Sequence, residues 1–563
     1  MILSDVTYST AMHGVRKVAM TLMFVAFVGV ASAAPPVPSA RLLAKADPWI
    51  AQKLAADGMS EMLVVLSEQA DLSLAEQKSD KTQRGQFVHD TLRATAGRTQ
   101  APLLAMLKAR GVEHRAYWVA NMIWVKTDAS VADELAGRTD VSRLAANPSV
   151  RMPALPAVNA VDAAPNATSA IEWGVSKIRA PEMWAAGFTG QGIVVAGADT
   201  GYSWTHPALV GKYRGWNGSS VNHNFQWHDA IHTGGGSCGA NTTAPCDDSG
   251  HGTHTMGTMV GDDGTGNQVG VAPGARWIGC RNMDQGNGTP TTYAECFQWF
   301  IAPTDLADNN ANPALAPHVI NNSWGCPPSE GCDAAALIFL KTVVESVRAA
   351  GILIVASAGN EGPGCSSVAD PIAIYAASLT VGATNSSDSL ASFSNRGPVT
   401  VDGSNRLKPE IAAPGVSVRS SVPGGGYISL SGTSMAGPHV VGGAALLMSA
   451  YPALAGKPDL LQSRLVHSAV PHSAAVNCGN LSTVIPNNEY GWGRLDVKAA
   501  YDAPFAVLDV DHNGVSEASK DGVLMLRYLL GFRGNALVAG AVGTGARRTS
   551  AVDIETYIGS LLQ

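Results

Sequence analysis

An alternation of apolar and helical segments between residues 171 and 503 constrains the fold most strongly. Five almost continuously apolar runs occur there, at 193–198, 277–280, 318–321, 352–357 and 379–382. Longer stretches with helical character lie at 334–350 and 435–450. Strands that are apolar on both faces and alternate with helices are typical of a parallel sheet with helices on both sides. The predicted fold class is therefore α/β, a three-layer domain with a mainly parallel sheet.

Composition places this sheet in an ordered globular chain. The 563 residues exceed what one hydrophobic core usually serves, so we expect two to four units. Charged residues make up 15% of the chain, against about 25% in average soluble domains. The formal net charge is −7 and no long basic run occurs, so we expect no nucleic-acid partner.

A smaller unit precedes the parallel-sheet region. Its predicted elements follow the order β-α-β-β-α-β and lie at 62–66, 72–110, 117–119, 122–125, 131–135 and 141–144. This order is typical of a small α+β sandwich. The flanking stretches 34–47 and 151–170 are rich in Pro and Ala, so we expect linkers there.

The first 33 residues have the pattern of a secretory signal peptide. Arg16 and Lys17 precede an apolar run at 18–30, and Ala31-Ser32-Ala33 offers a cleavage site. The run is too short to cross a bilayer comfortably, although an uncleaved anchor is the alternative. We therefore expect a secreted protein without a membrane segment after signal cleavage.

The cysteines agree with export. All eight lie at or after residue 238, mostly in loops, and Cys238/Cys246 and Cys326/Cys332 each bracket a short loop. An even number of loop cysteines in an exported chain predicts about four disulfides, with the pairing open. Free thiols or a metal site are the alternatives.

Three short segments contain candidate catalytic residues. Asp199 ends an apolar run, His251 opens a helix of small residues, and Ser434 opens a long apolar helix. Each alone has a simpler interpretation: a turn-forming Asp, a metal pair with His254, or a helix-capping Ser. A serine nucleophile, however, needs a base and the base needs an orienting carboxylate. The three segments together therefore predict an Asp-His-Ser triad.

These segments resemble those of the subtilisin-like serine proteases, in which the residues follow the order Asp, His, Ser. The resemblance covers about 330 residues and is strongest to the bacillopeptidase F-type branch. It implies an endopeptidase that hydrolyses proteins or peptides through an acyl-enzyme, without a catalytic cofactor. A lipase or esterase would instead carry G-x-S-x-G and the order Ser, Asp, His. A non-catalytic scaffold-binding protein would not need the intact triad.

The resemblance also implies the remaining site residues. Asn360 matches the oxyanion-hole motif, where its amide and the Ser434 N–H would hold the developing charge; a turn-forming Asn is the alternative. An edge strand would pair with the substrate and line the pocket for the side chain before the cut. Its residues are Ser323, Trp324 and Gly325, with Ala358 and Gly359 on the opposite wall.

The last 60 residues contain a degenerate repeat with one calcium-type loop. Asp509, Asp511 and Asn513 stand at loop positions 1, 3 and 5, and the Val515 carbonyl at position 7. Position 12 is not acidic, but Asp521 follows one residue later. The pattern resembles a dockerin-like module with one structural calcium. The resemblance suggests a cohesin-like scaffold as partner, and stabilisation within the chain is the alternative role. A solvated turn is the alternative.

The resemblance implies that the smaller unit is a removable inhibitory propeptide, cut between about 152 and 171, although a permanent accessory domain is the alternative. The expected domains are a signal peptide (1–33), a propeptide with linkers (34–155), a subtilisin-like peptidase domain (156–503) and a small α-helical, dockerin-like calcium-binding module (504–563).

Overall fold

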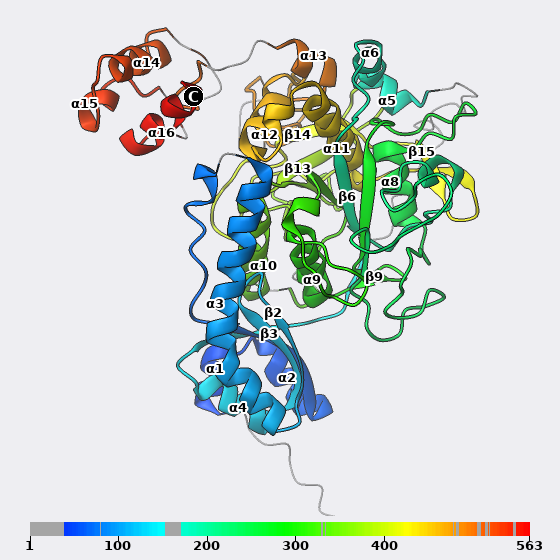
Figure 1. The fold of residues 1–563 in the computed structure, drawn as a ribbon, viewed down its shortest axis with the longest axis vertical. Helices are drawn as coiled ribbons and strands as arrows, with labels where there is room; N and C mark the ends of the chain where they lie inside the picture. Colours follow the sequence, from blue (N-terminus) through cyan, green and yellow to red (C-terminus); the bar gives the residue numbers. More distant parts are fainter. Residues whose placement is uncertain are drawn as a thin grey trace, which may run out of the picture. The chain divides into compact units, whose positions relative to one another are not determined.

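The computed structural model describes residues 39–563 except for short stretches within that range (Figure 1). Those stretches are residues 79, 153–170, 328–329, 333, 477, 480–482, 504–507, 513–515, 517, 544–545, 547 and 563. The expected signal peptide and most of the expected cleavage region lie outside the described residues. Within the described residues, no helix is long and apolar enough to cross a membrane.

A seven-stranded sheet forms the centre of the region after residue 171. Its strand order is β14-β13-β12-β11-β6-β8-β7, and every neighbouring pair is parallel. The predicted α/β class and all five predicted apolar strands are confirmed. The strands are β6 (Val194–Asp199), β7 (Trp227–Asp229), β8 (Arg276–Arg281), β11 (Val319–Asn322), β12 (Leu353–Ser357), β13 (Leu379–Thr384) and β14 (Ile411–Pro414).

Helices cover both faces of this sheet (Figure 1). Successive side chains of a strand point to opposite faces, and β6 shows the result. Ala196 belongs to the core that contains α9 and α10, whereas Val195 belongs to the core that contains α8 and α11. These helices are α8 (His251–Val260), α9 (Pro290–Ile301), α10 (Ala334–Ala349) and α11 (Thr433–Ala450).

Shorter elements complete this domain. They are α5 (Trp173–Lys177), α6 (Ala180–Ala185), α7 (Pro207–Val210), α12 (Pro458–His467), α13 (Val497–Asp502), the two-residue strands β9 (Met283–Asp284) and β10 (Asn287–Gly288), and the hairpin strands β15 (Val418–Val422) and β16 (Gly426–Leu430). The hairpin contacts α8, and β10 pairs with β9 at the edge near the site described below.

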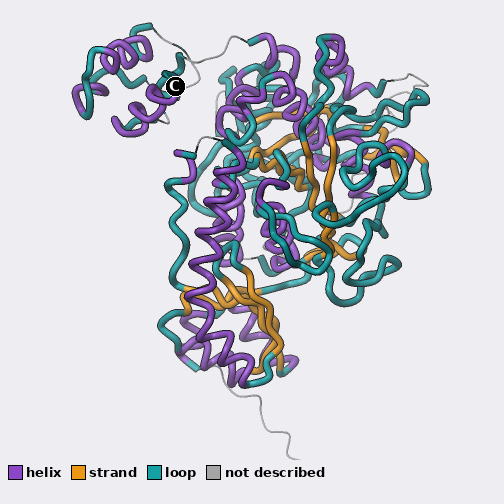
Figure 2. The backbone as a smooth tube through the Cα atoms, in the orientation of Figure 1, coloured by secondary structure: helices purple, strands orange, loops and turns teal. Residues whose placement is uncertain are grey.

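The smaller unit, residues 39–152, is called the pro-segment here, after the role that is proposed for it below. It contains an antiparallel sheet of order β2-β3-β1-β4, whose strands are orange in Figure 2. The predicted order of elements is confirmed. The elements are β1 (Met59–Leu66), α3 (Lys81–Ala109), β2 (Glu113–Tyr117), β3 (Met122–Asp128), α4 (Ala129–Gly137) and β4 (Val141–Ala146).

The prediction of a linker over residues 34–47 is wrong in its second half. Helix α1 (Ala40–Lys45) lies there, and α2 (Pro48–Asp57) follows it. The Ser39 hydroxyl caps α1 by accepting from the Leu42 N–H, and the Leu42 side chain is buried in the pro-segment core. Capping and one buried apolar residue thus give helical structure to a stretch whose composition favours a linker.

The pro-segment contacts α9 through hydrogen bonds. Asn147 Oδ1 accepts from the backbone N–H of Thr291 in the first turn of the helix. Farther along, Gln298 accepts from the N–H groups of Trp118 and Val119, which follow β2. These bonds satisfy backbone donors that a helix start and a turn leave without partners.

Four disulfides join the eight cysteines in the pairs Cys238–Cys246, Cys280–Cys296, Cys326–Cys332 and Cys365–Cys478. The first and third close the two short loops noted in the sequence. The last joins residues 113 apart in the chain, and the loop it closes contains β13 to β16 and α11.

The C-terminal residues form three helices around a small apolar core. Helices α14 and α16 belong to the two halves of the repeat, with a short α15 between them. The helices are α14 (Asp521–Leu529), α15 (Asn535–Val538) and α16 (Ala551–Leu561). Buried side chains from each, Leu524, Leu537 and Ile558, pack together.

We expect loss of the Cys365–Cys478 bridge to lower the free energy of unfolding more than loss of Cys238–Cys246. The chain separations are 113 and 8 residues, and loop-closure entropy predicts a difference of about 2 kcal/mol. Denaturant unfolding of the two double Cys→Ser variants, in a Ser434→Ala background to prevent self-digestion, measures it. Equal losses would contradict the prediction.

Candidate active site

Asp199 and His251 form a buried pair at one end of the sheet. Asp199 is the last residue of β6, and His251 is the first residue of α8. The Nδ1 atom of His251 donates to Asp199 Oδ1 at 2.7 Å, and the two side chains are 2% and 1% exposed. The Thr200 N–H and the Thr255 hydroxyl donate to the same carboxylate at 2.8 and 3.2 Å. The carboxylate therefore fixes the orientation and the tautomer of the ring.

The surroundings of His251 favour its protonated form. Burial alone lowers the pKa of His251, but the charge and hydrogen bond of Asp199, with a contribution from Asp247, outweigh burial and raise the pKa above its ordinary value. The Nε2 atom of His251 is buried and has no hydrogen-bond partner within the described part of the chain. An oriented imidazole with an available Nε2 can accept a proton there.

His254, which the sequence offers as an alternative metal ligand beside His251, is hydrogen-bonded to the protein backbone. Its Nε2 donates to the carbonyl oxygens of Val418 and Ile428 at 3.1 and 3.2 Å. Burial, followed by the nearby His251, lowers the pKa of His254 to about 3, so the ring is neutral. His254 therefore joins α8 to the β15–β16 hairpin and is not directed at a shared metal with His251.

Asp247 and Gly252 hold α8 against β6. Asp247 accepts from backbone N–H groups in the loop before α8 and from the Thr253 N–H inside it. A Cβ atom on Gly252 would lie 2.2 Å from the carbonyl oxygen of Gly201, so no larger residue fits. The small residues expected on this helix thus allow the close approach that positions His251.

Ser434 lies in the first turn of α11, where backbone N–H groups have no partner inside the helix. Pro438, four residues later, has no N–H to donate to the Ser434 carbonyl. The Ser323 hydroxyl donates to that carbonyl instead, at 3.2 Å. Ser323, predicted to bind substrate, therefore also supports the start of α11.

Asn360 follows β12 and is bonded to the same helix start. Its Oδ1 accepts from the N–H and the hydroxyl of Thr433 at 2.9 and 3.0 Å. Because the oxygen is engaged with Thr433, the amide nitrogen is the end that can donate toward the neighbouring pocket. Asn360 and Ser434 both line that pocket, together with Thr433.

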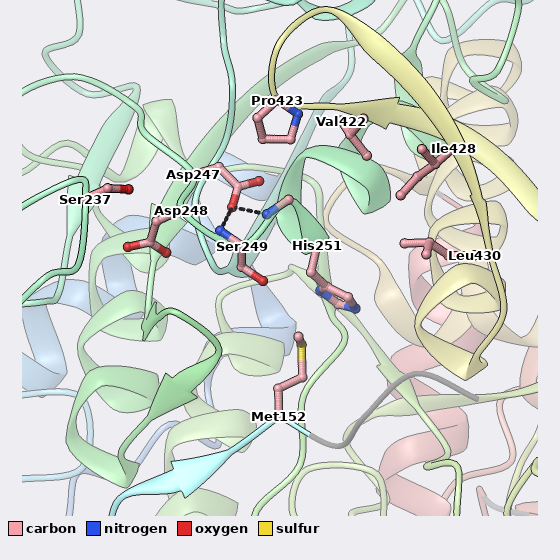
Figure 3. Close-up of a pocket in the computed structure, with 11 residues that line it drawn as sticks. Met152, Ser237, Asp247, Asp248, Ser249, His251, Val422, Pro423, Ile428 and Leu430 are labelled. Carbon is pink, nitrogen blue, oxygen red and sulfur yellow. Dashed lines mark hydrogen bonds between the residues drawn. The ribbon is translucent and has the colours of Figure 1, made fainter. Parts of the chain in front are cut away.

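A cleft of about 450 Å³ adjoins His251 (Figure 3). Its other wall comes from the β15–β16 hairpin, and its lining residues are Met152, Ser237, Asp247, Asp248, Ser249, Gly250, His251, Val422, Pro423, Ile428 and Leu430. Figure 3 shows the Met152 side chain directed toward His251. The pro-segment thus reaches the cleft through Met152.

A smaller pocket adjoins Ser434, with about 20 Å³ of open space. Its lining residues are Met152, Ser323, Trp324, Gly325, Ser357, Gly359, Asn360, Asp370, Thr433 and Ser434. Of the predicted substrate-binding residues, Ala358 is absent from this lining, since it is buried and its N–H bonds to the Val381 carbonyl. No hydrogen bond joins Ser434 to His251 among the described residues, and Met152 lines both pockets.

The end of the pro-segment forms an added strand at the cleft. Strand β5 (Val150–Arg151) pairs antiparallel with β10 (Asn287–Gly288), and the Met152 N–H donates to the Gly286 carbonyl at 2.7 Å. Extended chains are commonly bound in this way, by backbone hydrogen bonds to a free sheet edge. The sequence predicts a substrate strand at Ser323, Trp324 and Gly325, and β10 is a second edge that this prediction does not include.

Sequence reasoning also missed Asp247, Met152 and Asp370. Asp247 could have been noticed, because an Asp four residues before a helix start can cap its N–H groups. Met152 and Asp370 stand in loop segments without periodicity, and only the folded chain brings them to the pockets.

The C-terminal calcium-type loop brings three carboxylates together. Ligand oxygens of Asp509, Asp511 and Asp521 lie within 4.8 Å of one another, and all three residues are buried. Asp521 Oδ1 also accepts from the Asp511 N–H at 3.1 Å. The other predicted ligands, Asn513 and Val515, lie outside the described residues. Clustered carboxylate oxygens fit the ligand preference of calcium.

Comparison of the sequence relates this chain to known proteins. Residues 190–493 match the Subtilase family of peptidases. Bacillopeptidase F of Bacillus subtilis (strain 168) is 38% identical over 460 aligned residues, which cover 78% of this chain and 30% of that protein. Subtilisin E of the same strain is 33% identical over 333 residues, covering 59% and 71%. Subtilisin Savinase of Lederbergia lenta is 35% identical over 283 residues, covering 50% and 86%. The chain thus spans less than a third of bacillopeptidase F.

We expect Asp199→Asn to lower the pKa of His251 below the ordinary histidine value. The variant loses the charge that raises this pKa but keeps the burial that lowers it. NMR titration of the ring resonances measures the effect. His254 serves as an internal control because it should stay neutral throughout. An unchanged His251 pKa would show that Asp199 is not its cause.

Proposed function

Because the chain belongs to the subtilase family of serine peptidases, we propose that it is a secreted serine endopeptidase, made as a zymogen, that hydrolyses proteins or peptides. The observation that supports this most is the buried Asp199–His251 pair. The Nε2 atom of His251 has no hydrogen-bond partner among the described residues. The cleft beside His251 and the pocket beside Ser434 are both lined by Met152.

The chemistry is acyl transfer in two steps. His251 Nε2 takes the Ser434 hydroxyl proton as Oγ attacks the peptide carbonyl carbon. The imidazolium then protonates the leaving amine as the C–N bond breaks, which leaves the acyl group on Ser434. Water, deprotonated by His251, releases this acyl group. Asp199 assists both steps, because the raised pKa of His251 reflects how strongly the carboxylate stabilises the imidazolium.

The negative charge on the tetrahedral oxygen is stabilised from two sides. The Ser434 N–H lies in the first turn of the 18-residue helix α11, whose dipole favours an anion at this end. Asn360 adds its side-chain amide, with the oxygen end held by Thr433. Donors fixed before reaction need no reorganisation as the charge develops. Ser323 stabilises the first turn of α11, because its hydroxyl donates to the Ser434 carbonyl.

The pro-segment is proposed to inhibit the enzyme by binding as a substrate does. Its last described residues pair with β10, and Met152 lines both pockets. A peptide in this position would block the binding of other polypeptides in the cleft. The cut that releases it is placed between about 152 and 171, in the segment that continues from Met152.

The C-terminal module is proposed to bind one structural calcium, with no part in catalysis. Asp509, Asp511 and Asp521 would supply carboxylate ligands, and the loop residues Asn513 and Val515 the remaining oxygens. Bound calcium would offset the repulsion among three buried carboxylates. No comparison supports the cohesin-like partner, which stays a prediction from the sequence.

We expect Ser434→Ala to reduce casein hydrolysis by about 10⁴-fold or more, because the nucleophile is lost. The secreted variant should also keep the pro-segment, whereas the unmodified protein should begin between 152 and 171. Activity assays and mass spectrometry of the secreted product measure both. Ser387→Ala, at an exposed turn, is the matched control. Retained hydrolysis in Ser434→Ala would refute the assignment.

Calcium binding should depend on Asp511. Equilibrium dialysis of the full chain in the Ser434→Ala background is expected to give one bound calcium fewer per chain for Asp511→Asn, since a ligand of the cluster becomes neutral. Asp553→Asn is the matched control, because Asp553 is the counterpart of Asp521 in the second repeat half and is not part of the carboxylate cluster. Equal calcium counts in all three proteins would contradict this site.

A further inference from the structure

Asp370 is a buried carboxylate in the substrate pocket with no part in the chemistry above. It lies in the loop between β12 and β13 and lines the smaller pocket together with Ser434 and Asn360. Only 9% of the residue is exposed. This is the pocket expected to receive the substrate side chain that precedes the cleaved bond.

The Asp370 carboxylate has no hydrogen-bond donor and no cationic partner in the part of the chain that the structure describes. Buried carboxylates in folded proteins are ordinarily paired with a cation or bonded to several donors. An unpaired carboxylate that faces a binding pocket indicates that the ligand supplies the missing positive group. The proposed substrate is therefore the natural candidate for its partner.

The absence of a side chain at Gly325 leaves room for the Asp370 carboxylate at the pocket wall. A Cβ atom on Gly325 would lie 2.2 Å from Asp370 Oδ2 and 2.9 Å from its Cγ, so any larger residue would displace the carboxylate. The neighbouring Trp324 ring stacks on Tyr293 with 3.8 Å between ring centroids, which holds it as a firm wall. The alkyl part of a long side chain can lie along such a ring while its charged end reaches farther.

Within the described residues, the titratable groups near Asp370 carry no positive charge. Burial, then Glu361 and Glu330, raise the pKa of Asp370 to about 7, and the phenol of Tyr293 is the other titratable group near this carboxyl. Two neighbouring carboxylates therefore add to the attraction that this pocket exerts on a cation.

We propose that Asp370 selects substrates with Lys or Arg immediately before the cleaved bond, an inference that rests on the proposed endopeptidase function. The ammonium or guanidinium group pairs with the Asp370 carboxylate at the Gly325 side of the pocket. The alkyl stem lies against Trp324. With Met152 lining the pocket, only about 20 Å³ is open, so a substrate side chain enters after the pro-segment has left.

The selection depends on pH with a defined sign. Below a pH of about 7 the Asp370 carboxyl is protonated and its attraction for a cation is lost, whereas above it the carboxylate is ionised. Preference for a basic side chain should therefore rise as the pH increases through this range. The titration of His251 affects two substrates that differ only in side-chain charge equally. The ratio of their kcat/KM values therefore reports the titration of Asp370 alone.

The test uses the processed enzyme and two chromogenic peptides that differ only in Arg or citrulline before the cleaved bond. We expect kcat/KM to favour Arg by about 10- to 100-fold at alkaline pH, the range typical of a charge-assisted bond. The preference should fall on acidification and come close to one in Asp370→Asn. Asp402→Asn, at an exposed turn, is the matched control and should keep the unmodified ratio.

A ratio near one in the unmodified enzyme, or an unchanged ratio in Asp370→Asn, would overturn the proposal. If Asp370→Asn does not fold, the pH dependence of the unmodified enzyme decides alone, because a ratio that does not change with pH contradicts the role of Asp370. Absence of hydrolysis of both peptides and of casein, with Ser434 intact, would instead overturn the endopeptidase function itself.

Discussion

The hydrogen bond between Asp199 and His251 is the interaction on which the rest of the domain depends. A carboxylate is tolerated in an apolar interior only when donors and a cation offset its desolvation. Here the donors are a ring nitrogen and a threonine hydroxyl from α8, and the backbone N–H of Thr200, which follows β6. The end of the strand and the start of the helix must therefore touch, and Gly252 is the residue that permits it.

The parallel sheet brings the other functional groups to the same edge. Asp199 ends β6, Ser323 follows β11, and Asn360 lies beyond β12, so three neighbouring strands supply the site from their carboxyl ends. Helix α11 then begins beside them with Ser434. The bonds from Ser323 to Ser434 and from Thr433 to Asn360 join two strand ends to this helix start. The proposed substrate binding and charge stabilisation would thus use the same few contacts.

Much of this site could be predicted from the sequence, because its residues stand where an apolar run ends or an apolar helix begins. Asp199, His251 and Ser434 are of this kind, and so is Asn360. Asp370 could not be predicted, since its loop has no periodicity and only the approach of Gly325 gives it a role. The pairing of Val150 with Gly288 depends on docking of two units far apart in the chain. The disulfide between residues 365 and 478 depends on tertiary structure for the same reason.

The placement of the cysteines makes the pro-segment and the parallel-sheet domain respond differently to their redox surroundings. No cysteine precedes residue 238, so the pro-segment sheet and its helices form without oxidation. The loop that holds Ser434, by contrast, is closed covalently only when Cys365 and Cys478 are joined. In a reducing compartment the pro-segment can reach its structure while the region around Ser434 lacks this closure. Disulfide formation therefore acts on the parallel-sheet domain alone.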